Sequence, residues 1–210
     1  MVLEFLDYYK MYPDSIKRLI EDFEKLPGVG KKTAQRYAFK LLDMGKEDVD
    51  RFSEDLVVMR ERVKHCSICN HLTETDICPI CNDPSRNHEL VCVVEDSKTV
   101  LLLEELGTFN GVYHVLNGLI SPIDGVNPED INLLPLIERV KKESIQEVII
   151  TVKPSIEGET TTLYISTLLE KLNIKVTKIA YGVPMGADME YLDPVTLQLA
   201  MEHRTLVHNS

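Results

Sequence analysis

The sequence lacks a long apolar run, although hydrophobic residues make up 44% of its 210 positions, an ordinary share for a water-soluble protein. No stretch approaches the roughly 18 consecutive apolar residues that a membrane-spanning helix requires. The first residues also lack the basic segment and following apolar segment of a secretory signal. We therefore expect a soluble, cytoplasmic protein with no membrane partner.

The sequence also lacks the nucleotide-binding pattern G-x4-GK[ST], so we expect no nucleotide hydrolysis. Low-complexity tracts and internal repeats are absent as well. A domain takes about 150 residues on average, so a chain of 210 residues has room for two or three small modules.

The net charge of −11 is distributed very unevenly. Residues 1–65 hold 13 basic and 13 acidic residues, whereas residues 66–210 hold 10 and 21. Within the first part, residues 25–40 contain five basic residues and no acidic one. This distribution matters more than the total, and it indicates two surfaces with different partners, one basic and one acidic.

Four of the five cysteines follow the spacing C-x2-C, eight residues, C-x2-C: Cys66, Cys69, Cys78 and Cys81. Each C-x2-C turn can present two thiolates to one ion, and two such turns complete a closed tetrahedral shell. A closed shell leaves no position for water or substrate, so we expect one structural Zn²⁺ ion that supplies folding energy to residues 66–81.

Two other interpretations of the cysteines remain open. The four thiols could be unrelated, or His65 or His71 could replace one cysteine as a ligand. The fifth cysteine, Cys92, lies in an apolar run, where a free cysteine is usually a small buried hydrophobe. We expect Cys92 to be inert.

The part before the cysteines has the apolar periodicity of helices. The pattern predicts one helix over residues 15–24 with Ser15 as its N-cap, a second from residue 31 to about Gly45, and a third over residues 49–63. The break between the first two reads Leu-Pro-Gly-Val-Gly at residues 26–30. We expect a helix, a tight hairpin and a helix.

This hairpin resembles the helix-hairpin-helix motif of sequence-independent DNA binding. Glycines allow close backbone approach, and the start of the second helix favours a phosphate because its N–H groups and positive dipole end face outward. Such contacts hold phosphates without reading bases. The DNA-binding candidates are Gly28, Gly30, Lys31, Lys32 and Arg36. The alternative is an ordinary helical hairpin with a solvated basic face, in a zinc-stapled protein-interaction module.

After the cysteines the pattern changes to alternating strands and helices. Strands are predicted over residues 90–95, 113–116, 147–152 and 175–180, and helices over 97–106, 128–142, 159–172 and 194–203. Strands separated by helices of this length indicate parallel βαβ units.

Acidic residues gather where two of these strands end, at Glu95, Asp96, Glu157 and Glu159. The arrangement resembles the Toprim fold, in which an Asp-x-Asp-x-x-Gly loop and a glutamate hold magnesium for phosphoryl transfer. Here Lys153 and Ser155 stand at the aspartate places, and only Gly158 fits. We therefore expect no enzyme activity.

Two interpretations of the acidic residues remain open: a solvated rim, or a docking surface for a basic protein. The alternative function for the chain is a magnesium-dependent nuclease or topoisomerase-like enzyme.

Taken in order, these features resemble the RecR family of bacterial recombination mediators over nearly the whole chain. The characteristic stretches include LPGVGKKTAQRYAFKLL, CSICNHLTETDICPIC, YHVLNGLISPIDG, PSIEGETTTLYI and YGVPMGADMEYLDPVTLQLAMEHR. The resemblance implies an α+β protein of several modules: a helical helix-hairpin-helix module (1–65), a four-cysteine zinc finger (66–81), an α/β Toprim domain with a parallel sheet (89–181) and a C-terminal glycine-rich segment with a helix (182–210).

The resemblance also implies a function in recombinational DNA repair. Family members act with RecO and RecF to help load RecA onto single-stranded DNA, and they form dimers and ring-like tetramers. It matches Lys32 and Arg36 to DNA-contacting positions, and Glu157 and Glu159 to a partner-binding face. Two departures from the family pattern are Lys153, where asparagine is usual, and Ala187, where a second glycine is common. The implied location is the bacterial cytoplasm, in association with the nucleoid.

Overall fold

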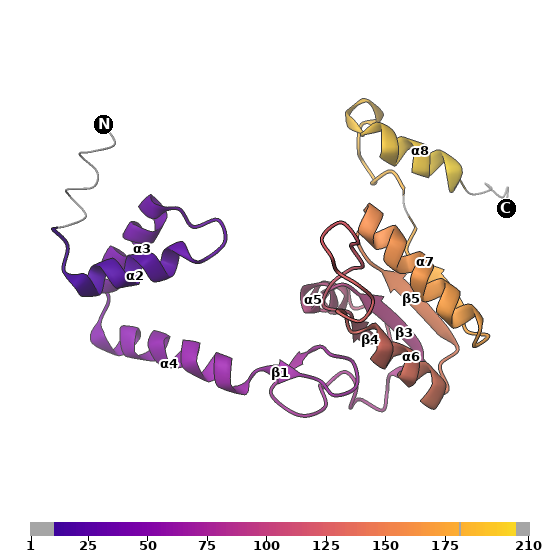
Figure 1. Cartoon of the computed structure of the whole chain (residues 1–210), viewed down its shortest axis with the longest axis horizontal. Helices are drawn as coiled ribbons and strands as arrows, with labels where there is room; N and C mark the ends of the chain where they lie inside the picture. Colours follow the sequence, from indigo (N-terminus) through magenta and orange to yellow (C-terminus); the bar gives the residue numbers. More distant parts are fainter. Residues whose placement is uncertain (1–10, 181, 205–210) are drawn as a thin grey trace. The chain divides into compact units, whose positions relative to one another are not determined.

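The structure, a computed structural model, describes residues 11–180 and 182–204, and it divides into one unit that ends at Arg62 and a second that begins at Val63. The first unit contains α2 (Asp14–Glu24), α3 (Lys31–Leu42) and α4 (Lys46–Arg62) (Figure 1). The three predicted helices are therefore present. The buried residues Ile20, Ala34 and Ala38 lie between α2 and α3, where the two alanines allow close approach of the helices.

Two helix starts in this unit differ from the prediction. Helix α2 begins at Asp14, and its N-cap is Pro13, whose carbonyl accepts from the N–H groups of Ile16 and Lys17; Ser15 is not the cap. The third helix begins at Lys46, three residues earlier than expected, because the carbonyl of Gly45 already accepts the helical bonds from the following turn. Apolar periodicity missed these polar first turns, since only later residues face the neighbouring helices.

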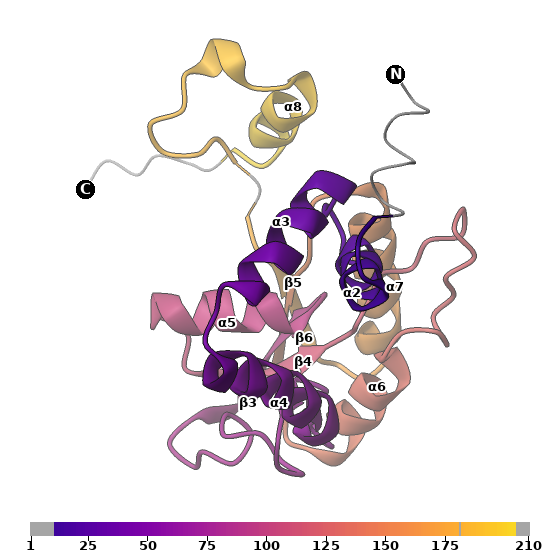
Figure 2. The ribbon, with the colours of Figure 1, turned by 90° about the vertical axis from the view of Figure 1, so that its left-hand side faces the viewer.

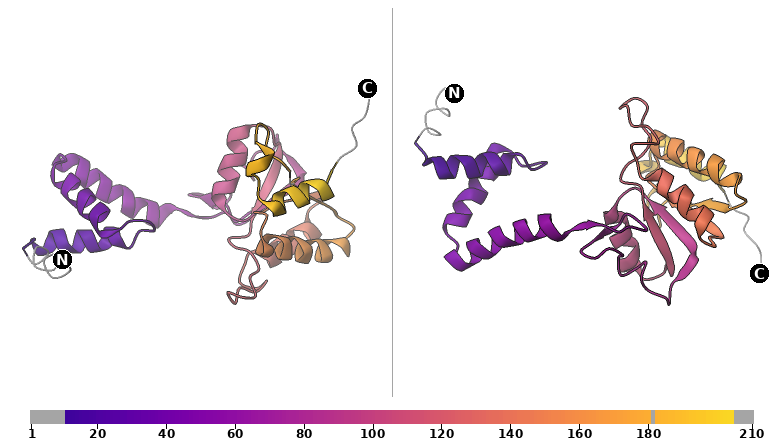
Figure 3. Two further views of the ribbon diagram at one scale, coloured as in Figure 1. Left: turned by 90° about the horizontal axis from the view of Figure 1, so that it is seen from above. Right: turned by 60° about the horizontal axis from the view of Figure 1, so that its bottom comes forward.

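The second unit is built on a four-stranded parallel sheet. Its strands are β3 (Asn87–Val94), β4 (Gly111–Val115), β5 (Glu147–Thr151) and β6 (Lys175–Lys178), in the order β4-β3-β5-β6. Helix α5 (Ser97–Leu106) covers one face, and α6 (Leu133–Lys142) and α7 (Ile156–Glu170) cover the other (Figures 2 and 3). The parallel sheet expected from the sequence is present.

The core lies on both faces of this sheet. Val91 and Val93 of β3 face the helices α6 and α7, whereas Cys92 and Val94 point to the side of α5. A strand buried on both faces needs apolar residues at every position, which is why residues 90–94 form a continuous apolar run.

Two helices of this unit begin at other residues than predicted. Helix α6 begins at Leu133, five residues after the predicted start, because residues 128–132 form turns that the carboxylate of Asp130 closes by accepting from the N–H of Asn127 at 2.8 Å. Helix α7 begins at Ile156, because the hydroxyl of Ser155 accepts from the N–H of Gly158 at 3.2 Å and caps the helix. Gly158 therefore lies in the first turn of a helix and not in a loop.

The outer edge of β4, on the side away from β3, is covered by side chains and by the cysteine segment. The carbonyl of Tyr113 accepts from Nη1 of buried Arg139 at 2.8 Å. The N–H of Val115 donates to the carbonyl of Cys69 at 2.8 Å, and its carbonyl accepts from Nδ2 of Asn70 at 3.0 Å. These bonds attach the cysteine segment directly to the sheet.

The C-terminal segment contains a 3₁₀ turn, η1 (Met189–Tyr191), and α8 (Pro194–Glu202), which Asp193 caps by accepting from the N–H of Thr196. A tight turn precedes them, with Gly186 at φ +78° and the N–H of Ala187 donating to the carbonyl of Pro184 at 3.1 Å. Alanine at position 187 is thus compatible with the turn. Over the residues that the structure describes, no helix has the length and apolar character of a membrane span.

His114 of β4 makes the stability of this unit dependent on pH. Its side chain is buried, its Nε2 lies 2.7 Å from the carbonyl of Asn132, and burial lowers its pKa to about 4. In the unfolded chain His114 takes up a proton as the pH falls through about 6.5, whereas in the folded chain it stays neutral until about pH 4. The free energy of unfolding therefore decreases as the pH falls below about 6.5. From pH 7 to pH 5 the free energy of unfolding should fall by about 2 kcal/mol through this residue.

The measurement is urea denaturation of the wild type and of His114→Gln at both pH values. The glutamine variant, which cannot take up the proton, should lose less stability than the wild type over this interval. An equal loss in the two proteins would contradict the prediction.

Candidate functional site

The four clustered cysteines converge on one point. A short antiparallel ribbon of β1 (Lys64–His65) and β2 (Leu72–Thr73) begins the segment, and all four cysteines are buried. Their sulfur atoms all lie within 4.8 Å of one another, and those of Cys69 and Cys78 are 3.6 Å apart. Sulfurs at about 2.3 Å from a tetrahedral Zn²⁺ are about 3.8 Å apart, so the donor set fits one zinc ion.

Backbone geometry holds the thiols in place. Asn70 adopts a left-handed conformation (φ +62°), which turns the chain back after the first pair of cysteines. Two N–H groups donate to sulfur, from Cys78 to Sγ of Cys66 at 3.3 Å and from Cys81 to Sγ of Cys78 at 3.4 Å. Such donors favour the thiolate form, which is the form that binds metal.

The thiols shift one another's pKa in opposite directions. The contact between Cys69 and Cys78 raises the pKa of Cys69 and lowers that of Cys78, and the neighbouring Cys69 raises the pKa of Cys81. Without a cation, therefore, the cluster keeps some thiols protonated. A bound Zn²⁺ would offset the charge of all four thiolates.

The two nearby histidines are outside this cluster. Nδ1 of His65 lies 2.9 Å from the carbonyl of Asn70, and the buried ring of His71 has a pKa that burial lowers. Among the described residues, only the four cysteines bring three or more metal-ligating side chains within reach of one ion. The fifth cysteine, Cys92, is buried in β3, and burial raises its pKa to about 11, which keeps the thiol protonated and unreactive near neutral pH.

The glycine hairpin between α2 and α3 leaves its backbone open. Gly28 has φ +77°, which favours glycine, and Gly30 is the extended N-cap of α3 without a side-chain cap. A side chain added at either glycine would meet no atom within 4 Å. The first turn of α3 is therefore accessible, as the approach of a phosphate to its N–H groups would require.

The basic candidates lie on the first two turns of α3. Lys31 and Lys32 are its first two residues and are exposed. Arg36 is exposed one turn further on, with its guanidinium 5.6 Å from the ring centre of Tyr37. The ring of Tyr37 packs edge-on against Phe23 of α2, so the arginine lies over an aromatic ring that the helix pair holds in place.

At the edge of the sheet, the predicted acidic residues do not share one site. Neighbouring parallel strands β3 and β5 bring Glu95 and Lys153 together, with Nζ of Lys153 3.2 Å from Oε1 of Glu95. Lys153 therefore places an ammonium group beside Glu95, the glutamate that directly follows β3.

The other three carboxylates have separate partners. Asp96 caps α5 by accepting from the N–H of Thr99, which contributes most to lowering its pKa. Glu157 accepts from the hydroxyl of Ser155 at 2.6 Å, and both oxygens of Glu159 lie 3.2 Å from Nζ of Lys178. The pairing of Lys178 with Glu159 was not predicted from the sequence, because it depends on the strand order that brings β6 beside the start of α7.

Comparison with known proteins follows the same division of the chain. Residues 16–59 match the RecR helix-hairpin-helix model, and residues 63–83 match the RecR zinc finger model with four cysteines. Residues 89–180 match the Toprim domain model, and residues 182–205 match the RecR C-terminal model. The recombination protein RecR of Staphylococcus aureus (strain JH9) is 49% identical over 194 residues, which cover 92% of this chain and 98% of the relative. The chain belongs to the RecR family. The RecR of Staphylococcus haemolyticus (strain JCSC1435) matches with the same identity and coverage.

Family membership agrees with the metal site and with the fold. The cysteines of the RecR zinc-finger region are the four that the structure brings together, and they are positioned to bind one zinc ion. The Toprim region corresponds to the parallel sheet with its helices. The membership of the RecR family that the sequence motifs indicated is thereby confirmed, and with it a role as a recombination protein.

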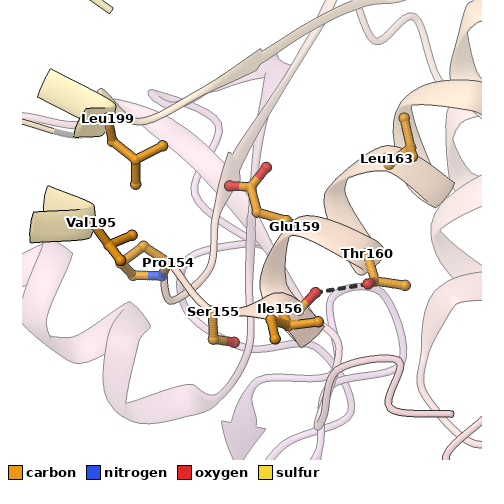
Figure 4. A pocket seen from close by; sticks show the side chains of 8 residues that line it. All are labelled: Pro154, Ser155, Ile156, Glu159, Thr160, Leu163, Val195 and Leu199. Carbon is orange, nitrogen blue, oxygen red and sulfur yellow. Dashed lines mark hydrogen bonds between the residues drawn. The ribbon is translucent and has the colours of Figure 1, made fainter. Parts of the chain in front are cut away.

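A cavity of about 660 Å³ lies beside α7 and α8 and was not predicted. Figure 4 shows Val195 and Leu199 of α8 near Pro154, at the start of α7, with Glu159 between the two helices. One feature of the sequence indicates an apolar surface here: the apolar residues of α7 lie on more than one face of the helix, so they cannot all pack against the sheet.

Proposed function

We propose that this chain is a non-catalytic recombination mediator, which binds single- and double-stranded DNA without sequence preference and acts with RecO and RecF to help load RecA onto single-stranded DNA. The observation that carries the proposal is the open glycine hairpin at the start of the basic helix α3. The chain's membership of the RecR family supports the recombination role.

The DNA contact is assigned to Gly28, Gly30, Lys31, Lys32 and Arg36. The glycines leave space for a phosphate beside the N-terminal turn of α3, and the three side chains add positive charge there. Phosphate oxygens are the same in every sequence, so these contacts provide binding without base specificity.

The Toprim edge supports a role without catalysis. Magnesium-dependent Toprim chemistry needs several carboxylates directed at one ion, whereas Glu95 here pairs with the ammonium of Lys153. An ammonium group offers no ligand and repels a divalent cation. Glu95, Asp96, Glu157 and Glu159 each have a partner within the chain, but they follow the ends of the neighbouring strands β3 and β5 and so lie along one edge of the sheet. We assign this edge as the face for basic surfaces of RecO and RecF.

Assembly of several copies into a dimer or a ring of up to four subunits is part of the proposal. Helix α4 has no buried residue, and Phe52 and Leu56 are 42% and 51% exposed. They line an apolar cavity of about 350 Å³ together with residues of α2 and α3. An exposed apolar surface of this kind supports contact between subunits, and several hairpins in one assembly would bind DNA more tightly than one. The proposed location is the cytoplasm, at the nucleoid.

The test is DNA binding by the double variant Lys32→Glu/Arg36→Glu. At about 0.1 M salt, its affinity for single-stranded DNA should fall about tenfold or more, because two phosphate contacts become repulsive. The slope of log affinity against log salt concentration should also decrease by about 1.4, because each contact to a phosphate of single-stranded DNA contributes about 0.7. Fluorescence anisotropy over a salt series measures both quantities.

The matched control is Lys141→Glu/Lys171→Glu, which changes the net charge equally at exposed positions of the second unit. This variant should bind DNA almost as the wild type does. Light scattering must show that both variants assemble as the wild type does. Unchanged affinity in the assembled hairpin variant would refute the assignment of DNA binding to α3.

A further inference from the structure

Tyr37 of α3 presents an aromatic ring beside the basic start of that helix. The residue is 40% exposed, and its ring packs edge-on against Phe23 of α2, with the ring centres 5.6 Å apart and the ring planes at 74°. Tyrosine has only two side-chain torsions, so a single packing contact restricts the ring strongly. The helix pair therefore holds an accessible ring in one orientation at its surface.

The group that lies over this ring is the guanidinium of Arg36. Its central carbon is 5.6 Å from the ring centre. In the part of the chain that the structure describes, no carboxylate forms an ion pair with Arg36. The attraction of an exposed cation to a ring is weak, whereas a bond from a guanidinium to a phosphate is charge-assisted and stronger. When Arg36 moves to a phosphate, it leaves a face of the Tyr37 ring uncovered.

Basic side chains lie on both sides of the ring along α3. Tyr37 follows Lys31 by six residues, about 9 Å along the helix axis, a distance that about three nucleotides of one strand span. Lys40 is exposed and three residues further on, so it is a neighbour of Tyr37 on the helix surface. Cations that follow the backbone of a strand, with an aromatic ring between them, are the combination that binds single-stranded nucleic acid.

We propose that Tyr37 stacks on one unpaired base of single-stranded DNA, while Arg36 and Lys40 contact the adjoining phosphates. The inference rests on the proposed function, and it gives the hairpin a preference for single strands over duplex. Bases in a duplex are already stacked on their neighbours, so their faces are not available to the ring. Every base has such a face, so stacking adds no sequence preference.

The test is Tyr37→Leu, because leucine keeps an apolar contact with Phe23 but has no ring. At about 0.1 M salt, affinity for a labelled oligo(dT) strand should fall about tenfold, whereas affinity for a duplex of equal length should stay nearly the same. Tyr37→Phe keeps the ring and should bind both as the wild type does. Fluorescence anisotropy measures the affinities, and circular dichroism must show that the helices of each variant are intact.

The matched control is Tyr164→Leu on α7, which removes a tyrosine that is also 40% exposed. This variant should bind the strand and the duplex as the wild type does. An equal loss of affinity for both DNA forms in Tyr37→Leu would overturn the inference, because the ring would then act only by positioning α3.

A second measurement reports on the ring directly. The chain contains no tryptophan, so Tyr37→Trp introduces a single fluorophore at this position. Stacking on a base should quench its emission when oligo(dT) binds, and the duplex should quench it much less. An unchanged emission at saturating oligo(dT) would refute the stacking contact, whatever the folding of the leucine variant.

The proposed function and this inference fail in different ways. If Lys32→Glu/Arg36→Glu binds DNA as the wild type does, the assignment of DNA binding to the hairpin fails. If that double variant loses affinity but Tyr37→Leu binds oligo(dT) as the wild type does, the phosphate contacts stand and the stacking contact is wrong.

Discussion

Replacement of Cys69 by serine should reduce the bound zinc from about one ion per chain to nearly none and should unfold residues 66–81. The four cysteines form a cluster with few apolar neighbours, so the metal is the main source of stability for this segment. Structural zinc contributes on the order of 10 kcal/mol to small zinc-binding segments, far more than the net stability of a typical hydrogen bond. Zinc content by atomic absorption and the thermal unfolding midpoint measure the two effects.

The matched control is Cys92→Ala, which also removes a buried cysteine but lies outside the cluster. This variant should keep its zinc and lose only the small stability of a removed thiol. A Cys69→Ser protein that retained a full equivalent of zinc would show that three cysteines and another group suffice.

Replacement of Gly158 by alanine should destabilise the second unit by about 3 kcal/mol or more, because the added methyl group would overlap the backbone carbonyl of Lys153. The backbone after β5 must then move, which should also separate Lys153 from Glu95. Urea denaturation measures the loss in free energy of unfolding, and hydrogen exchange of the α7 amides reports its location.

The matched control is Gly182→Ala, where an added methyl group would meet no atom within 4 Å. Its backbone is also outside the left-handed region that favours glycine. The two variants therefore carry the same substitution and differ in the space available to the added methyl group. Equal stability of Gly158→Ala and Gly182→Ala would contradict the close approach of α7 to Lys153.

The sequence predicted best the features that depend on local spacing. The cysteine pairs determine the metal cluster because each pair is a short turn, and the spacing alone limits the ligand geometry. The glycine hairpin was also predictable, since Gly28 needs a positive φ and the apolar period restarts immediately after Gly30. Parallel strands follow from the alternation of strands and helices.

Contacts between distant segments were not predictable. The pairing of Glu159 with Lys178 requires β6 to lie next to β5, and periodicity carries no information on strand order. The helix starts at Leu133 and Ile156 depend on polar turns, in which Asp130 and Ser155 bind backbone N–H groups. The cavity beside α7 and α8 was not predicted either, because its lining residues lie about forty positions apart in the sequence.

The bonds between the cysteine segment and β4 have a consequence for solubility. β4 is an edge strand of the sheet, and the N–H and carbonyl of Val115 on its open side pair with Cys69 and Asn70. An edge strand with free backbone groups is a template for pairing with another chain, and the sequence of β4, GVYHV, is buried throughout. Loss of zinc would free the N–H of Val115 for such pairing, whereas the carbonyls of Tyr113 and Val115 would keep their bonds from Arg139 and Asn132. The metal should therefore also limit aggregation through strand pairing at this point of the edge.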